Sequence, residues 1–197
     1  MYVMFILETK HINEQKGTLI YTESKCMIQN MIMDDTTLEE IIVPVIHGED
    51  SEMSIIIDDT LSHFLKLFSI VHFDDTHAHF GEISYKYEKG DVLTWETRLP
   101  KKIGTIEHLP TKILPNGYST IKVFENKLII NDTIEKNIFY KFNNFDETVH
   151  VDMDILKKVF EKHPNVPFTI YLEESFPLCI EIIGQYTIRY YVAPMEI

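Results

Sequence analysis

The sequence predicts an α+β protein of two similar domains, each with antiparallel sheets and one short helix. Strand signals dominate the chain, only two segments show helical periodicity, and both kinds of segment recur in the same order in the two halves. Strands alternate apolar and polar residues, whereas helices repeat apolar residues every three to four positions. Short polar turns between successive strand segments favour antiparallel pairing.

Two hairpins define the repeat. Residues 18–22 and 26–31 flank the polar turn 23–25, and residues 119–124 and 128–130 flank the turn 125–127. Further strands are expected, in chain order, at residues 40–45, 54–57, 83–87, 92–95, 149–151, 168–172, 178–183 and 187–192. The hairpins predict that each half of the chain builds its own sheet.

One helix is expected in each half, over about residues 59–72 and 152–163. The apolar positions at helical spacing are Leu61, Phe64, Leu65 and Phe68 in the first helix and Ile155, Leu156, Val159 and Phe160 in the second. Asp58, Asp59 and Thr60 are candidate N-caps of the first helix. Pro164 is expected to end the second.

The repeat places domain boundaries at residues 1–98 and 117–197. Between them, residues 99–116 contain Pro100, Pro110 and Pro115 and show no clean periodicity. Such a segment is typical of an extended connector. We therefore expect an interdomain connector over residues 99–116.

Composition limits the functional classes. The net charge of −13 and the pI near 5.0 argue against a simple nucleic-acid binder, unless a local basic surface is hidden in the total. Cys26 and Cys179 lie in apolar runs, which favours reduced core thiols over a disulfide. No apolar stretch approaches the roughly 20 residues of a membrane span, and residues 1–8 indicate a strand rather than a signal peptide. An intracellular protein without a membrane segment is expected.

The C-terminal third carries a resemblance to a known family. Asp-Ile-Leu-Lys-Lys-Val-Phe at 154–160 precedes a strand, then Ser-Phe-Pro-Leu at 175–178, and Tyr-Tyr-Val-Ala-Pro at 190–194. This order resembles the DNA sliding clamps of the proliferating cell nuclear antigen family. Residues 29–38 are similar to that family's Met-Asp-Ser segment. The segments 10–16 and 111–117 are too short for the additional helix that each family domain carries, so the chain resembles a pared-down clamp of the kind a virus could encode.

The resemblance implies clamp-type domains in a ring-forming subunit, and a function as a DNA polymerase processivity factor. Such a protein encircles duplex DNA without sequence preference and tethers DNA polymerase and other clamp-binding proteins. It implies a homotrimer, a clamp loader as a further partner, no cofactor and no catalytic activity. It places the protein at sites of DNA replication: nucleus, nucleoid or viral replication site. An alternative within the same fold is a transcription or assembly factor that does not close a ring.

The same resemblance implies which residues contact DNA. On the second helix, Lys157, Lys158 and Lys162 fall on the side away from the apolar stripe, and Lys66 holds the equivalent face of the first helix, with His63 beside it. Lysines that face phosphates give a long-ranged attraction that does not depend on base identity. A solvated helix face is the alternative interpretation of this pattern.

Partner proteins of the family insert aromatic anchors into an apolar pocket under the connector. The residues that match this pocket are Met33, Leu38, Ile106, Leu109, Pro177, Tyr191, Ala193 and Pro194. Burial of an aromatic side chain in such a groove gains a few kcal/mol. The alternative is that these residues only pack their own domains.

One segment suggests a different class of function. His77 and His79 alternate on an expected strand and therefore point the same way, with Asp74 and Asp75 nearby. This pattern allows a small metal-dependent hydrolase, but a polar connection between helix and strand is the favoured interpretation.

Overall fold

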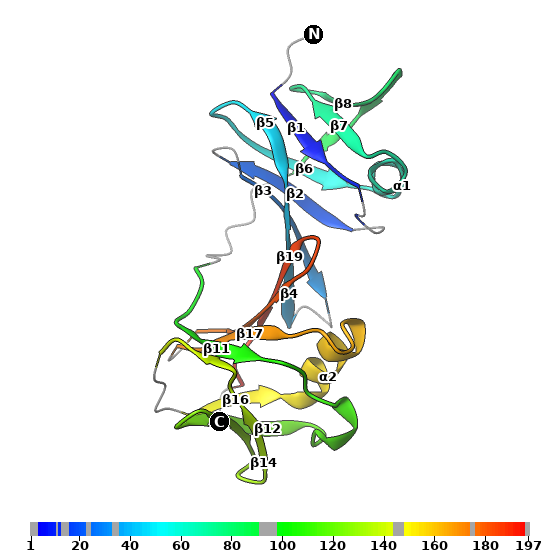
Figure 1. Ribbon diagram of the computed structural model, residues 1–197. Coiled ribbons are helices and arrows are strands. Elements are labelled where there is room, and N and C mark those ends of the chain that lie inside the picture. Colours follow the sequence, from blue (N-terminus) through cyan, green and yellow to red (C-terminus); the bar gives the residue numbers. More distant parts are fainter. Residues whose placement is uncertain are drawn as a thin grey trace. The chain divides into compact units, whose positions relative to one another are not determined.

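The computed structural model describes residues 4–10, 12, 16–22, 25–32, 36–90, 98–143, 148–173 and 176–195. Within these ranges it consists mainly of antiparallel strands with two short α-helices (Figure 1), which confirms the predicted fold class. The chain divides into two compact units. Unit 1 comprises Met1–Met31, Glu39–Glu96 and Gly184–Thr187, and unit 2 comprises Ile32–Leu38, Thr97–Ile183 and Ile188–Ile197. The domain boundaries at 1–98, 99–116 and 117–197 stay a prediction.

Unit 1 contains two groups of antiparallel strands. The first has the order β5 (Val45–Gly48), β1 (Phe5–Glu8), β7 (Ile70–Phe73), β8 (His77–Phe80), β9 (Ile83–Lys86). The second has the order β10 (Glu88–Lys89), β6 (Glu52–Ile57), β2 (Gly17–Thr22), β3 (Lys25–Ile32), β4 (Thr37–Val43). Strands β2 and β3 pair from Thr18 opposite Gln29 to Thr22 opposite Lys25, which confirms the first hairpin.

The helix of unit 1, α1 (Asp59–Leu67), begins where the sequence predicts. The Asp58 side chain accepts a hydrogen bond from the Leu61 backbone N–H at 2.8 Å, and this satisfies one of the free donors of the first turn. Leu61 and Leu65 are buried. The prediction that the helix extends to residue 72 is wrong. The backbone becomes extended at Phe68, and the residues that follow form β7, which pairs with β1.

A second correction concerns the strand expected at residues 40–45. The chain forms two strands there, β4 and β5, which are separated at Pro44. Proline has no backbone N–H to donate to a ladder, so a strand that reaches it loses a hydrogen bond. The residues expected to form a strand at 92–95 lie outside the described ranges.

Unit 2 repeats this architecture. One group of strands has the order β19 (Thr187–Val192), β18 (Leu178–Ile183), β17 (Phe168–Tyr171), β11 (Lys102–Ile106), β15 (Tyr140–Lys141), and the other the order β14 (Ile134–Asn137), β13 (Lys127–Ile130), β12 (Tyr118–Phe124), β16 (Thr148–Asp152). The β12–β13 pairing confirms the second hairpin. A short 3-10 helix, η1 (Thr111–Ile113), occupies the segment judged too short for a further α-helix.

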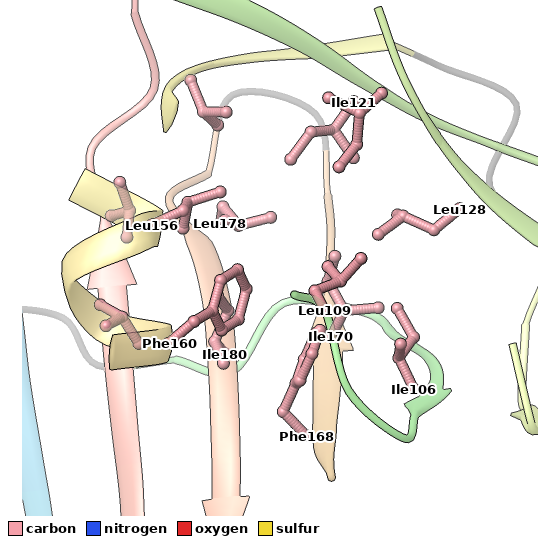
Figure 2. Packing of buried hydrophobic residues seen from close by; sticks show 14 of the residues in the cluster. Ile106, Leu109, Ile121, Leu128, Leu156, Phe160, Phe168, Ile170, Leu178 and Ile180 are labelled. Atoms are coloured by element: carbon pink, nitrogen blue, oxygen red, sulfur yellow. The ribbon is translucent and has the colours of Figure 1, made fainter. Parts of the chain in front are cut away.

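The core of unit 2 lies between its strands and α2 (Met153–Lys162). Asp152 caps this helix by accepting from the Asp154 backbone N–H at 2.9 Å. Figure 2 shows Leu156 and Phe160 of α2 directed toward the strand residues Leu178 and Ile180. The buried side of the helix consists of Met153, Leu156, Val159 and Phe160, while Ile155 is half-buried. The predicted stripe is therefore confirmed, apart from one position at its margin.

Candidate DNA and partner interfaces

The outward side of α2 presents two exposed lysines, Lys158 and Lys162, one turn apart. Together with Glu161 and Ile32 they line a shallow, open depression on unit 2. Residues four apart on a helix are neighbours on one side, so both ammonium groups reach the same stretch of surface. An extended anion can therefore contact both at once.

Lys157 differs from these two lysines. Its Nζ lies 3.6 Å from Asp154 Oδ1 and also donates a hydrogen bond to Asn116 Oδ1. Only 16% of its side chain is exposed. Because a carboxylate already neutralises part of its charge, Lys157 contributes less to an anion surface than its sequence position suggests.

The C-terminal end of α2 is held against the sheet. His163, the C-cap residue, has its Nε2 2.7 Å from the hydroxyl of Tyr190, a buried residue of β19. Lys162 Nζ lies 5.8 Å from the centre of the Tyr190 ring, within the range of a cation–π contact. The last turn of α2, and with it Lys162, is therefore positioned by packing as well as by the helix.

The helix of unit 1 offers a weaker anion surface. Lys66 and His63 are exposed on α1, as predicted. Asp59 lies in its first turn and forms an exposed ion pair with Lys16 at 3.6 Å. Helix α1 thus contains one lysine and one aspartate, whereas α2 contains three lysines and two acidic residues, Asp154 and Glu161.

The residues expected to bind partners fall into two groups. The buried group comprises Leu38 at 5%, Ile106 at 0%, Leu109 at 3% and Tyr191 at 7% exposure. Ala193 and Pro194 are exposed, Pro177 is half-buried, and Met33 lies outside the described residues. The expectation that Ile106 and Leu109 are surface residues of a connector does not match their position, because both pack in the core of unit 2, as Figure 2 shows.

Part of the expected connector, Lys102–Ile106, forms β11 and pairs with β17 from Tyr171 to Phe168. Just before it, Arg98 donates a hydrogen bond from Nη2 to Glu173 Oε1 at 2.6 Å and stacks its guanidinium 4.3 Å from the Phe176 ring centre. Arg98 therefore holds the first residues of unit 2 next to the segment that contains Pro177. Sequence reasoning missed this residue, whose only sequence signal is a lone arginine before Leu99-Pro100.

Unit 2 also exposes an aromatic edge, consisting of Phe139, Tyr140 and Phe142, each at least half exposed. Strand β15 ends its group of strands, so its outer backbone groups have no strand partner within the described chain. The Phe139 N–H donates to Thr105 O at 2.7 Å and the Phe142 N–H to Ile103 O at 2.8 Å, which holds the edge on β11.

Gly104 makes that close pairing possible. A Cβ at this position would lie 2.2 Å from Ile138 Cγ2 and 2.7 Å from the Tyr140 carbonyl oxygen. Any larger residue at position 104 would therefore displace β15 and the aromatic edge with it.

His77 and His79 do point to the same side, with ring centres 6.1 Å apart. His79 Nε2 lies 2.8 Å from Asp74 Oδ2, whereas His77 Nδ1 is 4.0 Å from Asp74 Oδ1. In the described part of the chain, no three His, Cys, Asp or Glu side chains are grouped so that they could hold a metal ion. The geometry gives no support to the metal-dependent hydrolase.

The two cysteines do not offer reactive chemistry either. Cys26 and Cys179 are both buried and unbridged, as the sequence indicates. Burial raises the pKa of the Cys26 thiol far above its usual value, because a thiolate there would lose its hydration. A nucleophilic cysteine needs the opposite environment, accessible and electropositive.

Comparison with solved structures gives matches along the whole chain. The PCNA of A. fulgidus, solved with the C-terminal region of FEN-1, aligns with a TM-score of 0.64 at 16% identity, covering 100% of this chain and 99% of that one. Entamoeba histolytica PCNA aligns at 0.59 and 14%, covering 99% and 100%, and Thermococcus kodakaraensis PCNA at 0.57 and 12%, covering 91% and 90%. The chain has a PCNA-like clamp fold. The overall expectation of a clamp architecture is confirmed.

Other comparisons add little to this fold. No protein-family model matches the chain. The Plasmodium berghei (strain Anka) protein PbSufS, which is named as a cysteine desulfurase, is 31% identical over 96 residues. That match covers 48% of this chain but only 17% of PbSufS. Among the described residues, no helix is both long and apolar enough to cross a membrane.

Proposed function

We propose that the protein is a DNA sliding clamp that encircles duplex DNA and tethers a polymerase and other replication proteins. The end-to-end likeness to clamp folds supports this proposal most strongly. The exposed pair Lys158 and Lys162 adds a local basic surface to a chain with a net charge of −13. An acidic body with a small basic surface favours DNA contact at that surface alone.

A sliding contact has to be weak and independent of sequence. Lysine ammonium groups on phosphates meet both requirements, since each contact releases counterions without reading a base. In this proposal Lys158 and Lys162 carry the contact in unit 2 and Lys66 carries it in unit 1, while Lys157 plays a smaller part because of Asp154.

Ring closure would use the aromatic edge of unit 2. An unpaired edge strand is a template for pairing with another chain, and the exposed rings of Phe139, Tyr140 and Phe142 add apolar area to bury. We propose that β15 pairs with a different sheet edge of a second copy of the chain, a head-to-tail contact that closes into a homotrimer. Tyr140→Asp should then convert the assembly to monomers, whereas Ile183→Asp, at an equally exposed position in β18, should not.

Partner proteins would dock near the C-terminal run. Ala193 and Pro194 are exposed there, and Arg98 with Phe176 forms a fixed border next to Pro177. We propose these residues, rather than the buried Ile106 and Leu109, as the contact surface for a peptide with aromatic anchors. A clamp-binding peptide from a replication protein should lose affinity for Pro194→Asp and retain it for Ile113→Asp, an exposed control on η1.

Two measurements test the whole proposal. Native mass spectrometry at micromolar concentration should show a trimer, and the protein should lengthen the products of a cognate polymerase on a long circular template. The protein is first treated with a chelator, and the metal that the polymerase needs is then added back. This treatment should leave the stimulation unchanged. A stable monomer that binds partner peptides but never stimulates synthesis would instead favour a clamp-fold transcription or assembly factor.

A further inference from the structure

A chain of three hydrogen-bonded side chains in unit 1 lies outside the proposed DNA and partner surfaces. Ser84 Oγ lies 2.8 Å from His79 Nδ1, and His79 Nε2 lies 2.8 Å from Asp74 Oδ2. The order hydroxyl, imidazole, carboxylate is the arrangement that activates serine nucleophiles on unrelated folds. It uses His79, which the sequence had suggested for a metal.

The backbone explains why Ser84 and His79 meet. Strands β8 and β9 are joined by the two residues Gly81 and Glu82, with Gly81 at φ +63°, the conformation required at the first position of a type II′ turn. In such a hairpin the pair that flanks the turn, Phe80 and Ile83, is hydrogen-bonded, so the next pair, His79 and Ser84, is not. Side chains of a non-hydrogen-bonded pair lie closest together.

The same register leaves a backbone donor beside the hydroxyl. In a non-hydrogen-bonded pair the N–H groups point away from the partner strand. Strand β9 ends its sheet, so the Ser84 N–H is directed to the open edge, where a bound reagent can approach it. A backbone N–H in this position is the type of group that stabilises an oxyanion.

The protonation states follow from the carboxylate. Burial alone would raise the pKa of Asp74, but hydrogen bonds from His79 and from the Thr76 and His77 backbone hold it well below its usual range. An ionised carboxylate only accepts hydrogen bonds, so His79 Nε2 carries the proton. In the neutral ring Nδ1 is then bare and accepts the proton of the Ser84 hydroxyl.

We propose that Ser84 is an activated nucleophile that takes an acyl group from small activated esters, with His79 as the general base and Asp74 as a positioning residue. Ser84 Oγ forms a bond to the ester carbonyl carbon while its proton moves to His79 Nδ1. The carbonyl oxygen becomes an oxyanion beside the Ser84 N–H. When it collapses, the bond to the alkoxide breaks, and His79 returns the proton to that leaving group.

The access route suits small reagents. Ser84 is exposed, while the side chains of His79 and Asp74 are 13% and 22% exposed. The reagent therefore reaches the hydroxyl, and the imidazole and carboxylate stay largely shielded from water. Other titratable groups on this side of the paired strands are His72, opposite His79 on β7, and His77, with Lys86 opposite it on β9.

The test uses a biotinylated fluorophosphonate, with which the same hydroxyl forms a P–O bond and releases fluoride. The intact chain should gain one adduct, located by peptide mass spectrometry at Ser84. Ser84→Ala should abolish it, and His79→Gln should slow labelling at least 100-fold, as expected for loss of a general base. Ser51→Ala, a serine of the same unit outside the relay, is the matched control.

The dependence of the labelling rate on pH separates a base from a structural role. In the native chain the labelling rate should rise with pH and then level off, as for a reaction that needs an unprotonated general base. Asp74→Asn should lower the plateau, because the imidazole loses the carboxylate that positions it. Absence of an adduct at Ser84 in the folded protein, or equal labelling of native chain and Ser84→Ala, overturns the proposal. Neither result affects the proposed clamp function.

Discussion

The helices α1 and α2 are built alike on their buried sides and differently on their exposed sides. Each begins after an aspartate whose carboxylate accepts from a backbone N–H of the first turn, Asp58 at 2.8 Å and Asp152 at 2.9 Å. Each buries an apolar stripe that includes at least one leucine. On the outward side, however, α1 has Lys66 as its only lysine, whereas α2 has three.

The repeat therefore constrains packing and leaves surface charge free to diverge. A buried stripe has to match the sheet below it, since interiors are close-packed. Substitutions at exposed positions, away from helix caps and hydrogen-bond networks, change the free energy of unfolding little. One copy of the repeat can therefore become the main anion surface while the other contributes a single lysine, Lys66.

The largest expected effect concerns what the two helices share. Leu65→Ala and Leu156→Ala remove equally buried side chains, at 1% and 2% exposure, and each should lower the free energy of unfolding by about 2–5 kcal/mol. Urea titration measures this loss. Ile155→Ala, at a half-buried position of α2, should cost less. A leucine variant that unfolds like the native chain would show that its helix is not packed as described.

A smaller effect is expected at the caps. Asp58→Ala and Asp152→Ala each remove the capping acceptor and should cost about 1 kcal/mol. The loss at Asp58 should be the larger one, because its other oxygen accepts from the Tyr85 hydroxyl, a hydrogen bond that raises the pKa of Tyr85 to about 12. Thermal melting measures both variants. Asp58→Asn keeps an acceptor and serves as the control, which should recover most of the stability.

The difference between the helices predicts unequal roles in DNA binding. Replacing both Lys158 and Lys162 by alanine should lower the slope of log K against log salt by about 2, and Lys66→Ala by about 1. Lys157→Ala should change it less, because Asp154 already partners this lysine. Fluorescence anisotropy with duplex DNA at several salt concentrations gives the slopes.

The control for these lysine variants is Lys127→Ala, a lysine of unit 2 that is paired with Glu135 on a neighbouring strand. Its slope should equal that of the native chain. If Lys127→Ala lowered the salt slope as much as the double variant of α2, the anion surface would not be localised on α2.

The smallest expected effect is a pH dependence confined to unit 1. The folded-state pKa of Asp74 lies below its unfolded value of about 3.9, so its hydrogen bonds stabilise the fold above that pH, and this contribution is lost as the pH falls. The urea midpoint of the native chain should fall more steeply from pH 5 to pH 3 than that of Asp74→Asn. Parallel curves would contradict it.

Local patterns were sufficient to predict much of the fold. Both hairpins, both helix starts and the apolar stripe of α2 follow from residues close together in the chain. The end of α1 was harder, because residues 68–72 continue the helical spacing. Pairing of β7 with β1, more than 60 positions earlier in the sequence, overrides that local preference.

The candidate site was predictable only in outline. Spacing on a helix places Lys158 and Lys162 on the outward side, and this agrees with their exposure. It could not reveal that Lys157 is partnered by Asn116, a residue 41 positions away. Nor could it reveal that Arg98 contacts Glu173 and Phe176, because such contacts depend on how distant segments come together.

The sequence by itself determined the repeated order of strands and helices and the outward position of the lysines, because periodicity and capping act over a few residues. Tertiary structure alone decided that Ile106 is a core residue, since β11 becomes buried only when β17 pairs with it, and that Leu109 packs in the same core. It also decided that Lys157 meets Asn116 and that Arg98 meets Glu173. Burial and side-chain partnership are properties of segments that are distant in the chain, and no local pattern encodes them.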